Sequence, residues 1–177
     1  MTPGFTSLLL EFKPRHRPDP AVLLREIRQA PLRTTAVDST TPPTEIPVVY
    51  DGPDLVRVAQ VTGLNVNEVV RLHAATTYYV QILGFAPGFP YLSGLDRRLH
   101  VPRLATPRAR IPAGSVAIGG EHTGIYPVAT AGGWNLLGRT SFSLMDPVVA
   151  AQGQATAFRL KPGDWVRFIP VDSIPGT

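Results

Sequence analysis

Cysteine is absent from this chain of 177 residues, and charged residues make up only 17% of it. Without cysteine there is no disulfide framework and no thiolate nucleophile or metal ligand, so nothing points to an oxidising compartment. No apolar run approaches the ~18 residues that a membrane-spanning helix needs. The opening text, MTPGFTSLLLEF, also lacks the basic and long apolar regions of a signal peptide. The sequence therefore predicts a cytoplasmic protein with no membrane partner.

Proline and glycine are abundant, with 19 and 16 residues, and hydrophobic residues make up 44% of the chain. This hydrophobic content is sufficient for a real core, and the length suits one ordinary domain or a compact domain with a small appendage. The combined proline and glycine content lies below the range that is typical of disordered chains. Together with short apolar runs, it favours a turn-rich β structure.

The positive charge is carried almost entirely by arginine, with a formal net charge of +4 at pH 7 and a pI of about 9.8. Arginine favours planar contacts with carboxylates and phosphates, which leaves both nucleic acids and small anions open as partners. Residues 54–75 contain two short helical patterns around Gly63, as in a helix-turn-helix motif. The second helix would begin with Asn65, Asn67 and Glu68, however, and a carboxylate is unfavourable against DNA phosphates. We therefore expect no nucleic-acid partner.

The first part of the chain has the pattern of a small β-α unit. Residues 7–12, SLLLEF, are predicted to form a buried strand, and Asp19 and Pro20 open a helix as its N-cap and first residue. The apolar face of that helix consists of Leu23, Leu24 and Ile27. Residues 31–47 are rich in Thr, Ser and Pro and show no periodicity, so they are predicted to be a linker. The domain boundary falls within this linker, which separates residues 1–40 from residues 41–177.

The second domain begins with helical patterns and continues with β patterns. After a short strand over 46–50, two helices are predicted at 53–62 and 66–74, and Asn65 with Glu68 resembles a capping box at the start of the second. From Tyr78 onward, short β-rich runs alternate with Gly and Pro, which favours an antiparallel barrel or sandwich. These runs cover residues 78–85, 115–120, 134–138, 156–160 and 165–171.

Three stretches are rich in glycine and proline, at residues 84–95, 111–120 and 124–138. Taken singly, each is explained by β-turns, because glycine supplies positive φ and proline fixes φ. Aromatic and polar side chains accompany the glycines, however, and loops that carry exposed aromatics usually line a binding site. The side chains concerned are Phe85, Phe89, Tyr91, His122, Thr123, Tyr126 and Trp134.

His122, in GGEHTGIYP, could be a proton shuttle, a neutral hydrogen-bond donor to a substrate, or a solvated histidine in a turn. Arg110 and Arg139 adjoin apolar segments, so they are the candidates for inward-facing contacts with an anion. The other arginines of residues 97–108 are expected to form a solvated face. The four histidines show no metal-ligand spacing, so no metal site is expected, and neither GxxxxGK[ST] nor GxGxxG occurs.

Three long motifs follow one another in the chain: LGFAPGFPYLSGLD, VPRLATPRARIPAGSVAIGG and HTGIYPVATAGGWNLLGRT, with LKPGDWVRF after them. In sequence and spacing they resemble the allophanate hydrolase subunit 1 family, also described as the KipI kinase-inhibitor family and as the B subunits of bacterial ATP-dependent 5-oxoprolinases. The resemblance covers about residues 46–171. It implies a mainly β fold with short helices: a cyclophilin-like β-barrel in which loops held by Gly and Pro carry the aromatics of a pocket.

The resemblance also implies a function. The chain would be one subunit of a hetero-oligomeric, ATP-dependent hydrolase of a cyclic amide, with 5-oxoproline as the expected substrate. Its partners would be the homologous allophanate hydrolase subunit 2, known in 5-oxoprolinases as the C subunit, and the 5-oxoprolinase A subunit. The isolated chain would be inactive.

The same resemblance implies roles for individual residues. Arg110 and Arg139 would bind a carboxylate or phosphate, and His122 and Thr123 would hydrogen-bond the lactam. The pocket walls would be Phe89, Tyr91, Tyr126 and Trp134. The alternative function is a regulatory module that binds and inhibits a sensor histidine kinase.

Two features depart from the family pattern. The family usually has glutamine at the position of His122, so this chain keeps a hydrogen-bonding side chain there and adds a titratable one. Family members also begin with a longer N-terminal domain, and residues 7–12 with the following helix resemble only its last strand and helix. We therefore expect an abbreviated α/β segment before the barrel.

Overall fold

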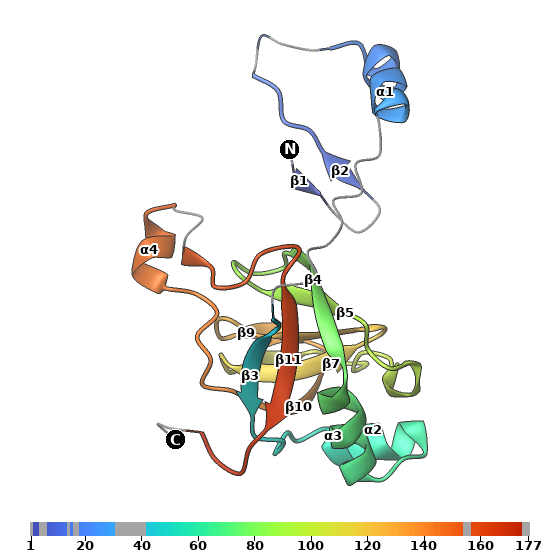
Figure 1. The fold of residues 1–177 in the computed structure, drawn as a ribbon, viewed down its shortest axis with the longest axis vertical. Coiled ribbons are helices and arrows are strands. Elements are labelled where there is room, and N and C mark those ends of the chain that lie inside the picture. The colour runs from blue at the N-terminus through green and yellow to red at the C-terminus, as the bar shows by residue number, and fades with distance from the viewer. Residues whose placement is uncertain are drawn as a thin grey trace. The chain divides into compact units, whose positions relative to one another are not determined.

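The computed structural model describes residues 2–3, 7–13, 15, 18–30, 42–153 and 157–174. The chain divides into two compact units, Met1–Thr41 and Pro42–Thr177, which are taken in turn (Figure 1).

The first unit contains a short antiparallel pair, β1 (Thr2–Pro3) and β2 (Leu8–Leu9), and the helix α1 (Pro20–Gln29). The predicted start of α1 is confirmed, because the Asp19 carboxylate accepts a hydrogen bond of 2.8 Å from the Ala21 N–H. The strand predicted over residues 7–12 covers only Leu8–Leu9 in the structure. No residue of α1 is buried, and Leu24 and Ile27 of its apolar face are exposed.

The predicted linker lies mostly outside the described residues, at 31–41. The prediction is wrong for the last part of this linker, because residues 44–47 belong to the strand β3 (Thr44–Val48), in which Ile46 and Val48 are buried. Thr and Pro mask this strand in the sequence. It pairs in parallel with the last strand of the barrel, which the local sequence does not reveal.

The second unit is a β-barrel with short helices, as predicted. The remaining elements are α2 (Leu55–Thr62), α3 (Val66–Ala75), β4 (Thr77–Leu83), β5 (Pro90–Ser93), the 3-10 helix η1 (Arg97–Leu99), β6 (Arg108–Ile111), β7 (Ser115–Gly119), β8 (His122–Ile125), β9 (Thr130–Gly132), β10 (Asn135–Arg139), α4 (Pro147–Ala151) and β11 (Trp165–Pro170). Seven strands form one sheet in the order β10-β7-β8-β5-β4-β11-β3, and β6 pairs separately with β9.

The seven-stranded sheet closes on itself where β3 ends. Val49 and Arg139 exchange two backbone hydrogen bonds of 2.9 Å, which join the end of β3 to the end of β10. Gly138 permits this approach, because a Cβ there would lie 2.2 Å from the Val49 carbonyl oxygen. The two outer strands of the sheet thereby meet at one bridge, and the barrel is nearly closed.

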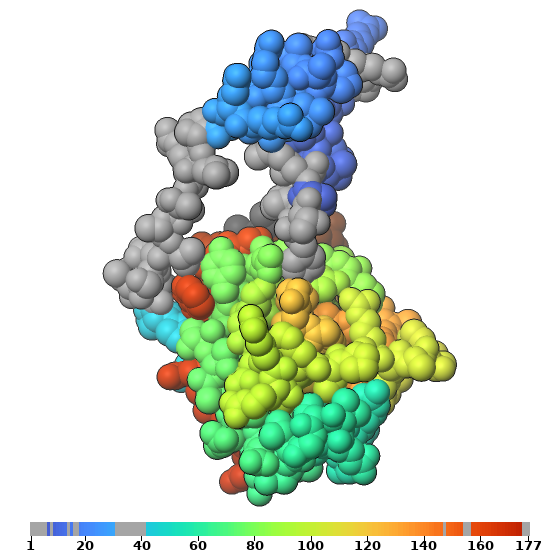
Figure 2. All heavy atoms as spheres, turned by 90° about the vertical axis from the view of Figure 1, so that its right-hand side faces the viewer, coloured from blue at the N-terminus to red at the C-terminus, as the bar shows by residue number. Residues whose placement is uncertain are grey.

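The helices α2 and α3 lie together at one end of the barrel, below its strands in Figure 1 and teal in Figure 2. Gly63 ends α2 with φ of 70°, and Asn65 and Glu68 form the predicted capping box of α3. The apolar faces of both helices join the barrel core through Leu55, Val58, Val69 and Leu72. The two helices thus pack against the barrel over the same residues that suggested a helix-turn-helix motif.

Strand alternation divides the apolar residues into two cores. In β7, Val116 and Ile118 belong to the barrel interior, whereas Ala117 belongs to a second cluster on the outer face of the wall. In β10, Leu137 and Leu136 are divided in the same way. The second cluster, called the outer core, contains Phe89, Ile111, Ala117, Tyr126, Trp134 and Leu136.

The glycine-rich stretches contain more strand than predicted. β5, β8 and β9 all lie within or beside segments that the sequence presents as turns, and His122 begins a strand instead of occupying a turn. Conversely, the strand predicted over 156–160 is represented among the described residues by a single bridge between Met145 and Phe158. Glycine was misleading because several of these glycines serve side-chain packing instead of chain reversal.

Candidate functional site

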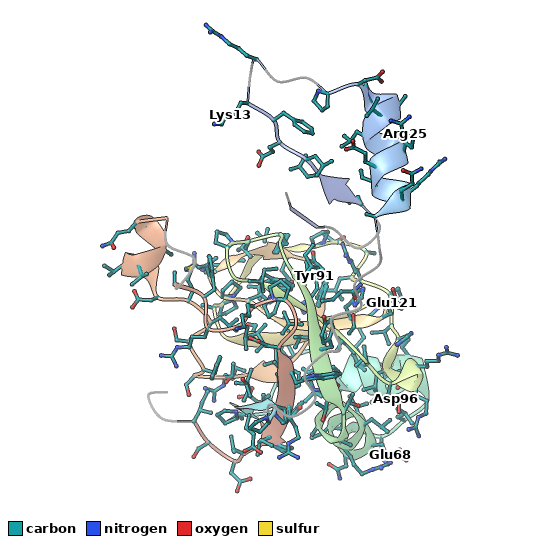
Figure 3. The ribbon with its side chains drawn as sticks, turned by 45° about the horizontal axis from the view of Figure 1, so that its top comes forward. Lys13, Arg25, Glu68, Tyr91, Asp96 and Glu121 are labelled. Atoms are coloured by element: carbon teal, nitrogen blue, oxygen red, sulfur yellow. The ribbon has the colours of Figure 1, made fainter. Side chains whose placement is uncertain are left out.

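Aromatic rings cover the outer face of the barrel wall, with Phe89 at their centre. Its ring meets four others edge to face: the centroid distances are 5.4 Å to Phe85, 5.1 Å to Tyr91, 5.1 Å to Tyr126 and 5.3 Å to Trp134. Phe89, Tyr126 and Trp134 are buried, while Tyr91 (labelled in Figure 3) is half-buried. The structure therefore brings together all four predicted pocket walls, and each edge-to-face pair stabilises the cluster beyond its buried area.

Glycines make room for these rings on the strands. A Cβ at Gly119 would lie 2.8 Å from the Trp134 ring, and a Cβ at Gly124 would lie 2.9 Å from the Phe89 ring. Gly119 and Gly124 have ordinary φ values, so their role is to let the rings approach the backbone closely. This close approach explains why glycine and aromatic residues occur together in the sequence.

A small cavity of about 60 Å³ opens between the rings. Its lining consists of Phe85, Phe89, Tyr91, Arg103, Tyr126, Gly132, Gly133 and Trp134. Phe85 stands at the cavity with 61% of its surface exposed. Its φ of 67° is positive, which is unfavourable for a bulky residue and usually indicates a constrained, functional position.

A broad, open groove of about 530 Å³ involves the neighbouring turn between β7 and β8. It is lined by His100, Val101, Pro102, Arg103, Gly119, Gly120, Glu121 and His122. Arg103 is the residue common to the groove and the cavity, and its guanidinium carbon lies 5.9 Å from the centroid of the Trp134 ring. The sequence reasoning missed Arg103, because it placed this residue in a solvated run of arginines.

His122 faces the same side as the aromatic cluster. Its ring meets that of Tyr91 edge to face at 6.1 Å, and its Nε2 lies 3.6 Å from a carboxylate oxygen of Glu121. The His122 side chain is 18% exposed. Burial lowers the pKa of His122, and the nearby Glu121 only partly opposes this effect. The ring is therefore neutral at pH 7, and a hydrogen bond with the backbone of Leu92 helps to hold it in place.

Thr123 lies on the opposite face of β8, inside the barrel. Its side chain is fully buried, and its Oγ1 donates to the Ala117 carbonyl at 3.0 Å and lies 2.8 Å from His73 Nε2. The structure thus separates Thr123 from the cavity, contrary to the prediction of a substrate contact. The reason is the two-residue period of a strand, which points adjacent side chains to opposite faces.

A chain of buried hydrogen bonds passes through His73. Because Thr123 gives its single proton to Ala117, it accepts from His73 Nε2–H, and His73 Nδ1 in turn accepts from the Tyr50 hydroxyl at 2.7 Å. The Phe168 ring stacks on His73 with centroids 4.6 Å apart. Burial lowers the pKa of His73 to about 3, so the imidazole is neutral and holds α3 to the barrel.

Neither of the two arginines predicted to bind an anion lies at the cavity. Arg110 is exposed on β6, and Arg139 donates from Nε to Asp51 at 2.7 Å at the barrel closure. A third arginine, Arg108, instead forms the inward-facing pair: its guanidinium donates to Asp54 at 2.7 Å, and Asp54 also accepts from the Leu136 N–H. Adjacency to an apolar strand did not determine the direction of these side chains.

Two further observations bear on the chemistry. Over the described ranges, no group of three or more His, Asp and Glu side chains could hold a metal ion. The same part of the chain contains no helix that is both long and apolar enough to cross a membrane.

Known proteins share this sequence and fold. The family model for the carboxyltransferase domain, subdomain C and D, matches residues 1–155. The 5-oxoprolinase B subunit of Escherichia coli O157:H7 is 54% identical over 129 residues, which cover 71% of this chain and 57% of that protein. The 5-oxoprolinase B subunit of Bacillus subtilis (strain 168) is 45% identical over 130 residues, which cover 72% and 52%.

A solved structure of a conserved uncharacterized protein from Pyrococcus horikoshii superposes with a TM-score of 0.67 and 39% identity, covering 86% of this chain and 65% of that one. The chain spans a little over half the length of the two curated relatives. The resemblance seen in the three motifs is confirmed: the chain belongs to the family of the carboxyltransferase domain, subdomain C and D.

Proposed function

We propose that this chain is the B subunit of an ATP-dependent 5-oxoprolinase and that its aromatic cavity and adjoining groove supply part of the substrate site. The observation that carries this proposal is the high identity to two 5-oxoprolinase B subunits. Such a complex is expected in the cytoplasm.

The geometry of the outer core supports the binding of a small, flat, cyclic amide. Tyr91 and Trp134 present ring surface at the cavity, and the neutral imidazole of His122 lies next to Tyr91 at the adjoining groove. A hydrogen bond to the amide oxygen would stabilise the negative charge that develops there when the ring is attacked. Thr123 has no part in this proposal, because its hydroxyl belongs to the barrel interior.

The site is open, and this supports the requirement for partners. The enclosed cavity of about 60 Å³ is far smaller than a typical ligand pocket of roughly 300 Å³ or more, and the larger groove is shallow and exposed to solvent. The sequence also contains no phosphate-binding loop. ATP binding and closure of the groove are therefore assigned to the other two components, namely the A subunit and the homologous C subunit.

Reconstitution of the chain with these two components, ATP and 5-oxoproline tests the proposal. We expect the isolated chain to show no catalytic activity and the complex to form glutamate with coupled ATP hydrolysis. His122→Gln should retain activity, because glutamine also offers a donor and an acceptor. His122→Ala should lose about 10- to 100-fold in kcat/KM, the equivalent of one buried hydrogen bond of about 1–3 kcal/mol.

Arg110→Gln is the matched control, because Arg110 is exposed and lies outside both cavities. Failure of the complex to form glutamate, while the same partners are active with another B subunit, would contradict the proposed function. Full activity of His122→Ala would remove His122 from the site.

A further inference from the structure

The arginines of the barrel unit differ in what their guanidinium groups contact. Five of them face a fixed polar partner: Arg98 pairs with Asp96, Arg108 with Asp54, Arg139 with Asp51 and Arg167 with Glu45, while Arg57 donates to Asn135. Arg103 differs from these. Within the described ranges it forms no ion pair with a carboxylate, and its guanidinium instead lies over the face of the Trp134 ring.

Arg103 lies at the edge of the candidate site, where its guanidinium could contact a ligand. The side chain is exposed and lines both the small cavity and the open groove, so it stands where the two meet. The contact with the Trp134 ring holds the guanidinium beside the cavity without using its N–H donors on a carboxylate, so these donors can meet an incoming group. That edge matches a carboxylate through two parallel hydrogen bonds.

The surrounding charges agree with an anionic ligand. Arg103 lines the groove and acts on His122 in the direction of lowering the pKa of that ring, which shows that the guanidinium charge lies close to it. The one carboxylate that lines the groove, Glu121 (labelled in Figure 3), is 73% exposed, so water screens its charge. An anion at the solvent-facing edge of the Arg103 guanidinium therefore meets a favourable field.

From this geometry we infer that Arg103, held over the Trp134 ring, is the residue that binds the carboxylate of the ligand, with the ring of the ligand directed toward the aromatic cavity. The ligand class is a small cyclic monocarboxylate. The inference rests on the proposed function for the nature of that ring, but not for the presence of an anion site. Arg103 takes the role that the sequence suggested for Arg110 and Arg139.

The fluorescence of Trp134 reports directly on this site. Trp134 and Trp165 are the two tryptophans of the chain, and Trp165→Phe leaves Trp134 as the single emitter. We would titrate this full-length variant with three probes: 5-oxoproline, its neutral analogue 2-pyrrolidinone, and 2-furoate, a cyclic carboxylate without an amide. Both carboxylates should cause saturable changes in emission, and 2-pyrrolidinone should bind at least about tenfold more weakly than 5-oxoproline.

Substitutions then identify the anion-binding group. Arg103→Gln should weaken both carboxylates by at least about tenfold and leave 2-pyrrolidinone unchanged, while Arg103→Lys should fall between, because lysine keeps the charge but not the planar fork. Arg110→Gln and Arg139→Gln should bind like the parent. Unchanged far-ultraviolet circular dichroism would show that the exposed Arg103 can be replaced without unfolding the chain.

The outcomes separate this inference from the proposed function. If both carboxylates bind through Arg103 and the reconstituted complex does not hydrolyse 5-oxoproline, the anion site stands and the proposed substrate is wrong. Carboxylate binding that is equal in Arg103→Gln and parent, an equal loss in Arg110→Gln, or no saturable response in the parent overturns the inference.

Discussion

The two faces of the barrel wall are packed with different kinds of side chain. The interior face carries aliphatic side chains such as Val116, Ile118 and Leu137. The buried His73 ring at this face has a hydrogen-bond partner at each of its two nitrogens. On the outer face, aromatic rings pack closely against glycines, and a small cavity opens beside Arg103, whose guanidinium forms no ion pair with a carboxylate of the described residues. The comparison indicates that the interior supplies stability and that the outer face is shaped for binding.

The largest expected effect concerns the interior and comes from acid. The folded-state pKa of His73, about 3, lies below its ordinary value of 6.5, so the unfolded chain binds this proton first as the pH falls. The free energy of unfolding should therefore decrease below pH 6.5 by about 1.4 kcal/mol per pH unit from this group, or about 2 kcal/mol at pH 5. Above pH 6.5 this contribution is fully present.

Urea unfolding at a series of pH values, with His73→Gln as the reference, isolates this contribution, because glutamine does not titrate but can still donate to Thr123 and accept from Tyr50. The difference between parent and variant should shrink steadily from pH 7 to pH 5. Parallel curves for parent and His73→Gln would show that His73 is not held neutral.

An intermediate effect is expected on the outer face. Gly119→Ala places a methyl group 2.8 Å from the Trp134 ring, so the ring must move, at a cost of about 1–3 kcal/mol. The unfolding free energy should fall by that amount, and the Trp134 emission should shift as the ring becomes more exposed. Gly84→Ala is the control, since the nearest atom to its new methyl group, on Tyr91, is 3.9 Å away. Unchanged emission in Gly119→Ala would contradict the close contact between this strand and the ring.

The smallest expected effect is at Phe85. Because its φ is positive, Phe85→Gly relieves about 1 kcal/mol of backbone strain, which roughly offsets the loss of ring packing against Phe89 and Tyr126 and the greater freedom of glycine in the unfolded chain. Phe85→Ala loses the same packing and keeps the strain. The glycine variant should thus be the more stable of the two by up to about 1 kcal/mol in urea unfolding. The reverse order would mean that Phe85 is not strained.

The fold was predictable from the sequence because the three long motifs occur in order, and the capping signals at Asp19 and Asn65 gave correct helix starts. The gathering of Phe89, Tyr91, Tyr126 and Trp134 was predictable from the sequence, because these aromatics stand beside glycines that let the rings pack closely. The direction of individual side chains was not. Thr123 follows His122 in sequence but faces the other side of the wall, and Arg103 stood in a charged run that looked solvated. The direction of Thr123 follows from its place in the strand β8, and that of Arg103, which lies between η1 and β6, follows from its contact with Trp134.

The place of β11 in the barrel has a consequence for how the chain is made. Among the described strands it is the last in sequence, yet it lies between β4 and β3, which are synthesised long before it. Until residues 165–170 have left the ribosome, β3 and β4 therefore have unpaired edges in any partly formed barrel. Such edges can pair with other nascent chains. Completion of the barrel thus depends on one late insertion, and the interval before it is when the protein is most exposed to aggregation and most in need of chaperones.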